Sequence, residues 1–192
     1  MKPIMFDLRN LIYLSALLFA FSCGSSEKGV EYAELKTEMD SIATASQKEL
    51  LKNVSTAFRK GGTVYAVGFC NIMAIPITDS LSEAHRVLIS RITDRTRNPE
   101  NGLTTENDKA VFGSFRENKD LVDSLLTENS KIVYYKRINT SMPTCIKCHG
   151  NPEKDIEPAT LAKIKTLYPN DQATGYSMNE FRGLWRIEKD KN

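Results

Sequence analysis

The feature that most constrains this chain is a pair of cysteines followed directly by a histidine. Cys145 and Cys148 are separated by two residues and His149 comes next, which gives a C-x-x-C-H sequence. This spacing is the attachment signature of c-type haem. Each thiol can bond one of the two vinyl groups of a haem, and the adjacent imidazole then points at the iron from the same side. The motif predicts one covalent haem c, with thioether links at Cys145 and Cys148 and His149 as an axial iron ligand.

Three other interpretations of the motif compete with haem. The same cysteine pair is found as a thioredoxin-like dithiol, as half of a zinc site that His149 and Cys70 would complete, or as a structural disulfide. The dithiol interpretation lacks a clear strand-to-helix setting, because Pro143 and residues 150–152 indicate a loop. A zinc site would require neighbouring Cys148 and His149 to bind one tetrahedral metal. We therefore favour haem.

Residues 1–22 have the pattern of an export signal. A positively charged start precedes the apolar run 11–21, which fits a signal peptide and is too short to span a bilayer as a helix. Small residues then precede Cys23, as at the processing site of bacterial lipoproteins. We expect residues 1–22 to be removed, Cys23 to carry the lipid, and residues 23–30 to form a tether on the periplasmic side of a bacterial membrane. Haem c is also attached outside the cytoplasm, which agrees with export.

Composition narrows the function further. Apolar residues make up 41% of the 192 residues and charged residues 26%, which is ordinary for a globular domain. The net charge is +2 and no basic stripe is visible, so nothing indicates nucleic-acid binding. Beyond Cys23 three cysteines remain, and an odd number is a poor disulfide framework. The thiols are therefore expected to serve a cofactor.

Apolar residues at three- and four-residue steps predict a long N-terminal helix over residues 31–60, which Gly61 and Gly62 end. A second short helix is expected over 64–74 and ends at Pro76, because proline lacks the amide proton. Further helices are predicted after a cap at Thr104 or Thr105, with Leu121, Leu125 and Leu126 on the apolar face, and over 158–167.

Alternating and β-branched residues predict strands over 82–93, 131–138 and 176–187. Residues 139–152 are predicted as a loop that holds the motif. Helical runs followed by mixed strands and helices indicate a single α+β domain over residues 31–192.

A haem with one histidine ligand has a second axial position that another side chain can fill. Spacing alone does not choose between Cys70, on a short apolar stretch, and His85, the other histidine of the chain. Met73, Met142 and Met178 are weaker candidates.

Five segments in order carry a family resemblance: residues 67–71 (VGFCN), 91–101 (RITDRTRNPEN), 143–150 (PTCIKCHG), 167–176 (LYPNDQATGY) and 181–185 (FRGLW). Together they resemble the bacterial and cyanobacterial single-haem c-type proteins with a PAS-like fold, a family catalogued as a haem-binding domain of unknown function. The resemblance covers about residues 47–187. It implies a PAS-like antiparallel sheet with flanking helices that holds the haem.

The resemblance also implies a ligand pair. In that family the iron is bound by the motif histidine and by a cysteine near the start of the domain, and the matching positions are His149 and Cys70. Because the residues after Cys70 are more apolar than in the family, Met73 or His85 is the fallback ligand.

Three arginines between 91 and 97 are candidates to bind the haem propionates. They are Arg91, Arg95 and Arg97. A guanidinium group matches the geometry of a carboxylate, whereas the competing interpretation is a solvated strand face and turn.

The functional expectation is a redox or gas sensor, since PAS-like domains often sense through a bound cofactor. The alternative is a periplasmic, lipid-anchored electron-transfer cytochrome. A peroxidase-type enzyme is least favoured, because it needs an open iron position. The expected partners are the membrane, through the N-terminal lipid, and an unidentified redox or signalling protein.

Overall fold

The structure of the protein is a computed structural model that describes residues 24–191. The predicted signal segment 1–22 and Cys23 lie outside these residues. The chain divides into two compact units, one up to Glu38 and one from Met39. In the first unit residues 24–38 are helical, including residues 24–30 that were predicted as a tether. Everything described below belongs to the second unit.

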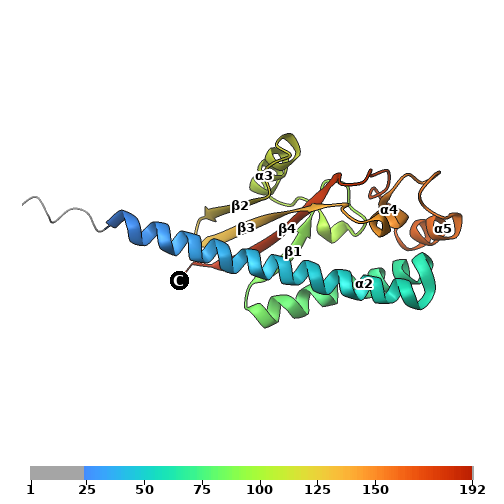
Figure 1. Cartoon of the computed structure of the whole chain (residues 1–192), viewed down its shortest axis with the longest axis horizontal. Helices are drawn as coiled ribbons and strands as arrows, with labels where there is room; N and C mark the ends of the chain where they lie inside the picture. Colours follow the sequence, from blue (N-terminus) through green and yellow to red (C-terminus); the bar gives the residue numbers. More distant parts are fainter. Residues whose placement is uncertain (1–23, 192) are drawn as a thin grey trace, which may run out of the picture. The chain divides into compact units, whose positions relative to one another are not determined.

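An antiparallel sheet forms the centre of the second unit. Its strands, among the described residues, are β1 (Leu88–Ile92), β2 (Asp123–Glu128), β3 (Lys131–Asn139) and β4 (Phe181–Asp190). Their order in the sheet is β1-β4-β3-β2, so the last strand pairs with the first (Figure 1). The α+β class, with an antiparallel sheet, flanking helices and a long N-terminal helix, is as predicted.

Helix α2 (Gly24–His85) is interrupted at the predicted stop, Gly61 and Gly62. Gly62 has a φ of 68°, a left-handed conformation that glycine adopts without strain. The helix reverses there (Figure 1), which produces within the second unit a first arm from Met39 to residue 60 and a second arm from residue 63 to His85.

The prediction that Pro76 ends the second arm was wrong. The helix continues to His85 because its end is fixed by the adjoining strand: the Ser82 hydroxyl accepts from the Ile89 amide at 3.0 Å, and the Ser82 carbonyl accepts from the Val87 amide at 3.2 Å. Tertiary contacts here outweigh the lost helical hydrogen bond.

The first arm of α2 lies against one face of the sheet. The Asp40 carboxylate accepts from the Tyr134 hydroxyl at 2.6 Å and from the Lys136 ammonium at 2.7 Å. The Gln47 amide oxygen accepts from the Trp185 ring nitrogen at 2.6 Å. Tyr134 and Lys136 are alternate residues of β3, and Trp185 lies opposite Lys136 on β4. All three side chains therefore point to the same face of the sheet, which is the face that α2 covers.

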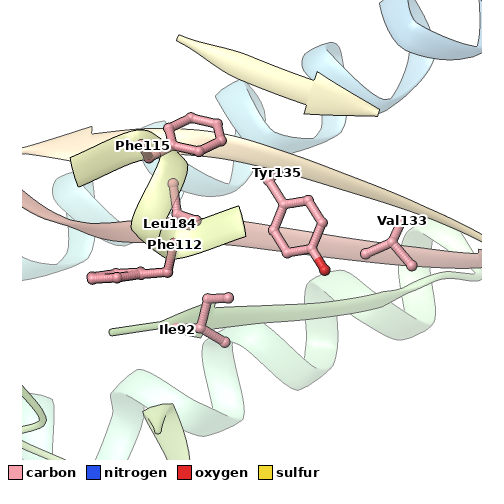
Figure 2. Packing of buried hydrophobic residues seen from close by; sticks show 6 residues of the cluster. All are labelled: Ile92, Phe112, Phe115, Val133, Tyr135 and Leu184. Carbon is pink, nitrogen blue, oxygen red and sulfur yellow. The ribbon is translucent and has the colours of Figure 1, made fainter. Parts of the chain in front are cut away.

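Helix α3 (Glu106–Glu117) covers the opposite face. The predicted cap Thr105 accepts from the Asp108 amide at 3.0 Å. Behind the helix lies an apolar cluster formed by Ile92, Phe112, Phe115, Val133, Tyr135 and Leu184 (Figure 2). Beside it, Asp108 is 1% exposed and accepts from the Tyr135 hydroxyl and the Arg186 guanidinium, both at 2.9 Å.

Two predicted boundaries around these elements were wrong. Helix α3 ends at Glu117, and Leu125 and Leu126 belong to β2 instead of to its apolar face. Pairing with β3 accounts for this, because Leu125 lies opposite Tyr134 and Leu126 opposite Val133. The strand expected over 82–93 is shorter, since Arg86 adopts a φ of 55° after the helix and β1 begins at Leu88.

Two further segments complete the fold. The predicted helix over 158–167 is confirmed as α5 (Pro158–Leu167), and it packs beside the second arm of α2 through a cluster that includes Val67 and Ile164. The expected loop over 139–152 contains instead a short helix, α4 (Pro143–His149). The last strand begins at Phe181, so only the later part of 176–187 is β4.

Candidate functional site

Helix α4 holds the C-x-x-C-H motif. Pro143 occupies its first turn, where the missing amide proton has no cost. Because positions i, i+3 and i+4 share one face of a helix, Cys145, Cys148 and His149 lie together. All three line one cavity.

Gly150 ends this helix where no larger residue fits. Its amide donates to the Ile146 carbonyl at 2.8 Å. A Cβ at this position would lie 2.3 Å from the Ile146 side chain and 2.6 Å from that of Asp155. The glycine therefore allows the chain to turn closely after His149.

The cavity has a volume of about 480 Å³, within the range of small-molecule and cofactor sites. Both arms of α2 form one side of it. The first arm contributes Leu50, Leu51, Val54 and Phe58, and the second arm contributes Val67 and Cys70. Helix α4, the ends of β1, β3 and β4, the segment 93–101 and Tyr168 form the remainder.

The ring of His149 is held in one tautomer. Its Nδ1 lies 2.7 Å from the carbonyl oxygen of Ala173, and because a carbonyl only accepts, Nδ1 carries the proton. Burial, then the nearby guanidinium groups of Arg97 and Arg182, lower the pKa of His149 well below its usual range. The ring is thus neutral and its Nε2 has a free lone pair, which is the form that binds a metal.

Arg97 fixes the segment that holds this carbonyl. Its guanidinium binds both carboxylate oxygens of Asp171, at 2.9 and 3.2 Å, and donates to the Cys148 carbonyl at 2.7 Å. The Asp171 carboxylate in turn accepts from the Ala173 amide at 3.2 Å. Arg97 therefore ties residues 171–173 to helix α4.

Two cysteines that line the cavity from different helices, Cys70 on α2 and Cys148 on α4, have raised pKa values. Burial raises the pKa of Cys148 to about 11. Burial also raises the pKa of Cys70, although Arg91 and Arg97 act in the opposite direction. In a reactive dithiol the nucleophilic thiol has a lowered pKa, and neither Cys148 nor Cys70 has one. The motif does, however, follow a strand and lie on a helix, contrary to our expectation of a loop.

The zinc and disulfide interpretations are not supported either. Among the residues that the structure describes, no three histidine, cysteine, aspartate or glutamate side chains are placed to share a metal ion. Cys70, Cys145 and Cys148 are all free thiols.

Comparison with known proteins agrees with this site. The family model of the Tll0287-like proteins matches residues 27–189. This chain belongs to the Tll0287-like family. The crystal structure of the cyanobacterial heme-protein Tll0287 superposes with a TM-score of 0.61, over 88% of this chain and 98% of that chain, at 20% sequence identity. The likeness establishes the fold, and the predicted family is confirmed. No curated protein matches the chain significantly.

The second-ligand candidates separate clearly in this Tll0287-like fold. Met73 is 38% exposed and Met178 is 44% exposed, and His85 is exposed at the end of α2; none of these lines the cavity. Cys70 and Met142 do. Met142 directly precedes α4, the helix that already carries His149, whereas Cys70 comes from a different helix, α2.

The three predicted arginines also separate. Arg91 and Arg97 line the cavity, but Arg95 does not. Arg95 donates to the carbonyls of Gln172, at 3.2 Å, and Thr174, so it supports the segment beside Asp171, and we do not retain it as a propionate contact.

Arg182 is a cavity residue that the sequence analysis missed. The available signal was its place in the segment 181–185, which contributed to the family resemblance. Nothing in the local pattern shows that an arginine at the start of β4 reaches the same cavity as Cys70.

Proposed function

We propose that this chain binds one haem c in the cavity, through thioethers at Cys145 and Cys148, with His149 and Cys70 as the axial iron ligands. The observation that carries the proposal is the shared cavity: residues of α4 and a cysteine from α2, far apart in sequence, line the same space. That the structurally similar Tll0287 is a heme-protein supports it.

The cavity residues fit the two chemically different parts of a haem. The first arm of α2 presents the apolar side chains Leu50, Leu51, Val54 and Phe58, which suit the face of a macrocycle. Guanidinium groups on the sheet side suit its carboxylates. When bound, the haem supplies a one-electron centre whose potential depends on the axial ligands. The chain contributes the thiols, a neutral imidazole with a free Nε2, and apolar walls.

We propose a redox- or gas-sensing role, without catalysis. Cys70 lies on the second arm of α2, beyond the glycine interruption, whereas the covalent attachment and His149 lie on α4. A change in iron ligation at Cys70 therefore acts on the second arm of α2, which the thioether bonds on α4 do not hold in place. Such an arrangement converts a ligation change into movement of a helix.

The ligand assignment is tested by absorption and EPR spectra of the chain produced with c-type haem maturation. We expect a low-spin ferric signal with thiolate character. Cys70→Met should abolish that character and raise the reduction potential, while Met73→Leu, outside the cavity, serves as the matched control. An unchanged spectrum and potential in Cys70→Met would eliminate Cys70. A wild-type spectrum without thiolate character that changes in Met142→Leu but not in Cys70→Met would identify Met142 as the ligand and contradict the assignment as well.

The sensing role is tested on the reduced protein. Binding of carbon monoxide, together with faster hydrogen exchange in residues 63–85, supports sensing. Rapid electron exchange with a partner cytochrome and no change in ligation would instead support a periplasmic electron carrier.

We also propose that the protein is exported and held by a lipid at Cys23 on the periplasmic side of a bacterial membrane, where a separate redox or signalling protein meets it. The export pattern of residues 1–22 supports this. Cys23→Ala should move the protein from the membrane to the soluble fraction; unchanged membrane retention and no labelled acyl chain in the wild type would contradict the anchor.

A further inference from the structure

Two guanidinium groups in the cavity lack the carboxylate partners that buried arginines normally have. The Nε atoms of Arg91 and Arg182 are buried without any hydrogen-bond partner. Among the side chains that the structure describes, no aspartate or glutamate forms an ion pair with either residue. An unpaired buried charge is costly, so these two groups require an explanation.

None of their described neighbours forms an ion pair with them. The Arg91 guanidinium lies 5.8 Å from the ring centre of Trp185. Arg182 donates one hydrogen bond to the Thr93 hydroxyl at 2.9 Å and lies 5.1 Å from the ring centre of Tyr176. Burial is the largest effect on both arginines and lowers the pKa of each; Cys70 acts in the opposite direction on Arg91, and Tyr176 and Asp171 act in the opposite direction on Arg182.

Two other enclosed arginines, Arg186 and Arg97, are paired with carboxylates. Arg186 pairs with Asp108 at 2.9 Å and with Glu188 at 2.8 Å. Arg97, although it lines the same cavity, is bound by Asp171. Asp171 is therefore paired with Arg97, and it acts on Arg182 only through a longer-range attraction, without an ion pair. The chain supplies carboxylates to these arginines but leaves Arg91 and Arg182 without any.

We propose that Arg91 and Arg182 form a paired guanidinium site that binds the carboxylate side chains of the porphyrin. This inference rests on the proposed haem function and specifies which residues recognise the charged edge of the ligand. The apolar lining from α2 distinguishes the ligand from a small inorganic anion, because the same cavity must accept a large apolar body and a negative charge. Of the arginines expected from the sequence, Arg91 keeps this role, Arg97 has a structural one, and Arg182 takes part instead.

The test compares two porphyrins that differ only at these carboxylates. The full chain without haem is titrated with iron protoporphyrin and with its dimethyl ester, which has no free carboxylate. Quenching of Trp185, the one tryptophan of the sequence, reports binding. Because a charge-assisted hydrogen bond contributes about 1.5–3 kcal/mol, the wild type should bind the diacid about tenfold tighter or more.

Variants assign that preference to the two arginines. Arg91→Met with Arg182→Met should bind both porphyrins equally. Arg91→Lys with Arg182→Lys keeps the charges and should retain part of the preference. Arg116→Gln, an exposed arginine on α3, removes the same charge elsewhere and should behave as the wild type.

The outcomes separate the two proposals. If the wild type binds neither porphyrin, the proposed haem function fails. If the wild type binds both equally, or if the double Met variant keeps the wild-type preference, the haem function stands and the paired guanidinium site is wrong. Should the double Met variant not fold, the wild type and the variant with Arg91→Lys and Arg182→Lys decide. The latter is expected to prefer the diacid over the dimethyl ester, but by a smaller factor than the wild type does.

Discussion

The imidazole of His149 and the backbone carbonyl of Ala173 are 2.7 Å apart, and this contact makes a loop carbonyl the positioning group for the proposed iron ligand. Further contacts hold the segment that contains this carbonyl in place. Arg97 and Asp171 hold the surrounding segment against α4, and the Tyr176 amide donates to the His149 carbonyl at 2.9 Å. The ligand is therefore oriented by a segment that follows α5, not by its own helix.

The Arg97–Asp171 pair should therefore stabilise the fold measurably. Arg97→Met leaves a mostly buried carboxylate without its partner and should lower the free energy of unfolding by about 3 kcal/mol. Urea unfolding of the chain checks this. The exposed arginine in Arg116→Met is the control, with an expected loss below about 1 kcal/mol. Equal losses of unfolding free energy in the two variants would show that the Arg97–Asp171 pair stabilises the fold no more than an exposed ion pair does.

Gly150 should not tolerate a methyl group. Its Cβ would overlap Ile146 and Asp155, so Gly150→Ala should destabilise the chain by about 1–3 kcal/mol and reduce haem incorporation. Gly113, within α3, has open space around it, so Gly113→Ala should stabilise by about 0.5–1 kcal/mol. Thermal unfolding of both variants gives the comparison. A stable, fully haem-loaded Gly150→Ala protein would contradict the close turn after His149.

The buried carboxylate of Asp108 should be more important than an exposed one. Asp108→Ala leaves the Tyr135 hydroxyl and the Arg186 guanidinium without their acceptor, and a loss of about 3–5 kcal/mol is expected from denaturant unfolding. Asp94 forms an exposed pair with Arg116, so Asp94→Ala should lower the free energy of unfolding by less than about 1 kcal/mol. Similar losses at both positions would argue against the buried network.

Acid should weaken the fold through Glu188. Burial raises the pKa of this carboxyl, but hydrogen bonds from Lys131 and Arg186 outweigh it and hold the pKa below the ordinary 4.5. Because the folded-state pKa is the lower one, the stabilisation is fully present above pH 4.5 and is lost as the pH falls through the folded value. Glu188→Gln should show a shallower decline in stability below pH 4.5 than the wild type, measured by urea midpoints across pH. Parallel declines would contradict this assignment.

Elements with strong local signals were predictable from the sequence. Thr105 caps α3 as expected, α5 has the expected bounds, and Gly61 and Gly62 interrupt α2 where expected. In each case the signal is a property of neighbouring residues: a side chain that accepts from the first turn, an apolar period, or a glycine that adopts unusual dihedrals.

Features that depend on distant partners were not predictable. Leu125 and Leu126 fit a helical period, and only pairing with β3 makes them a strand. Pro76 is tolerated because Ser82 contacts the following strand. Arg182 reaches the cavity only once β4 lies beside β1. The motif residues could be chosen from spacing, but their supporting contacts, above all that between Ala173 and His149, come from the fold.

Covalent attachment of haem to Cys145 and Cys148 is tested by the pyridine haemochrome of the purified chain after acidified-acetone extraction, which removes any haem that is not covalently attached. We expect the wild type to keep one haem per chain with the spectrum of a double thioether, and Cys145→Ala with Cys148→Ala to keep none. A wild-type chain from a maturation-competent host that loses all its colour on extraction would contradict covalent attachment.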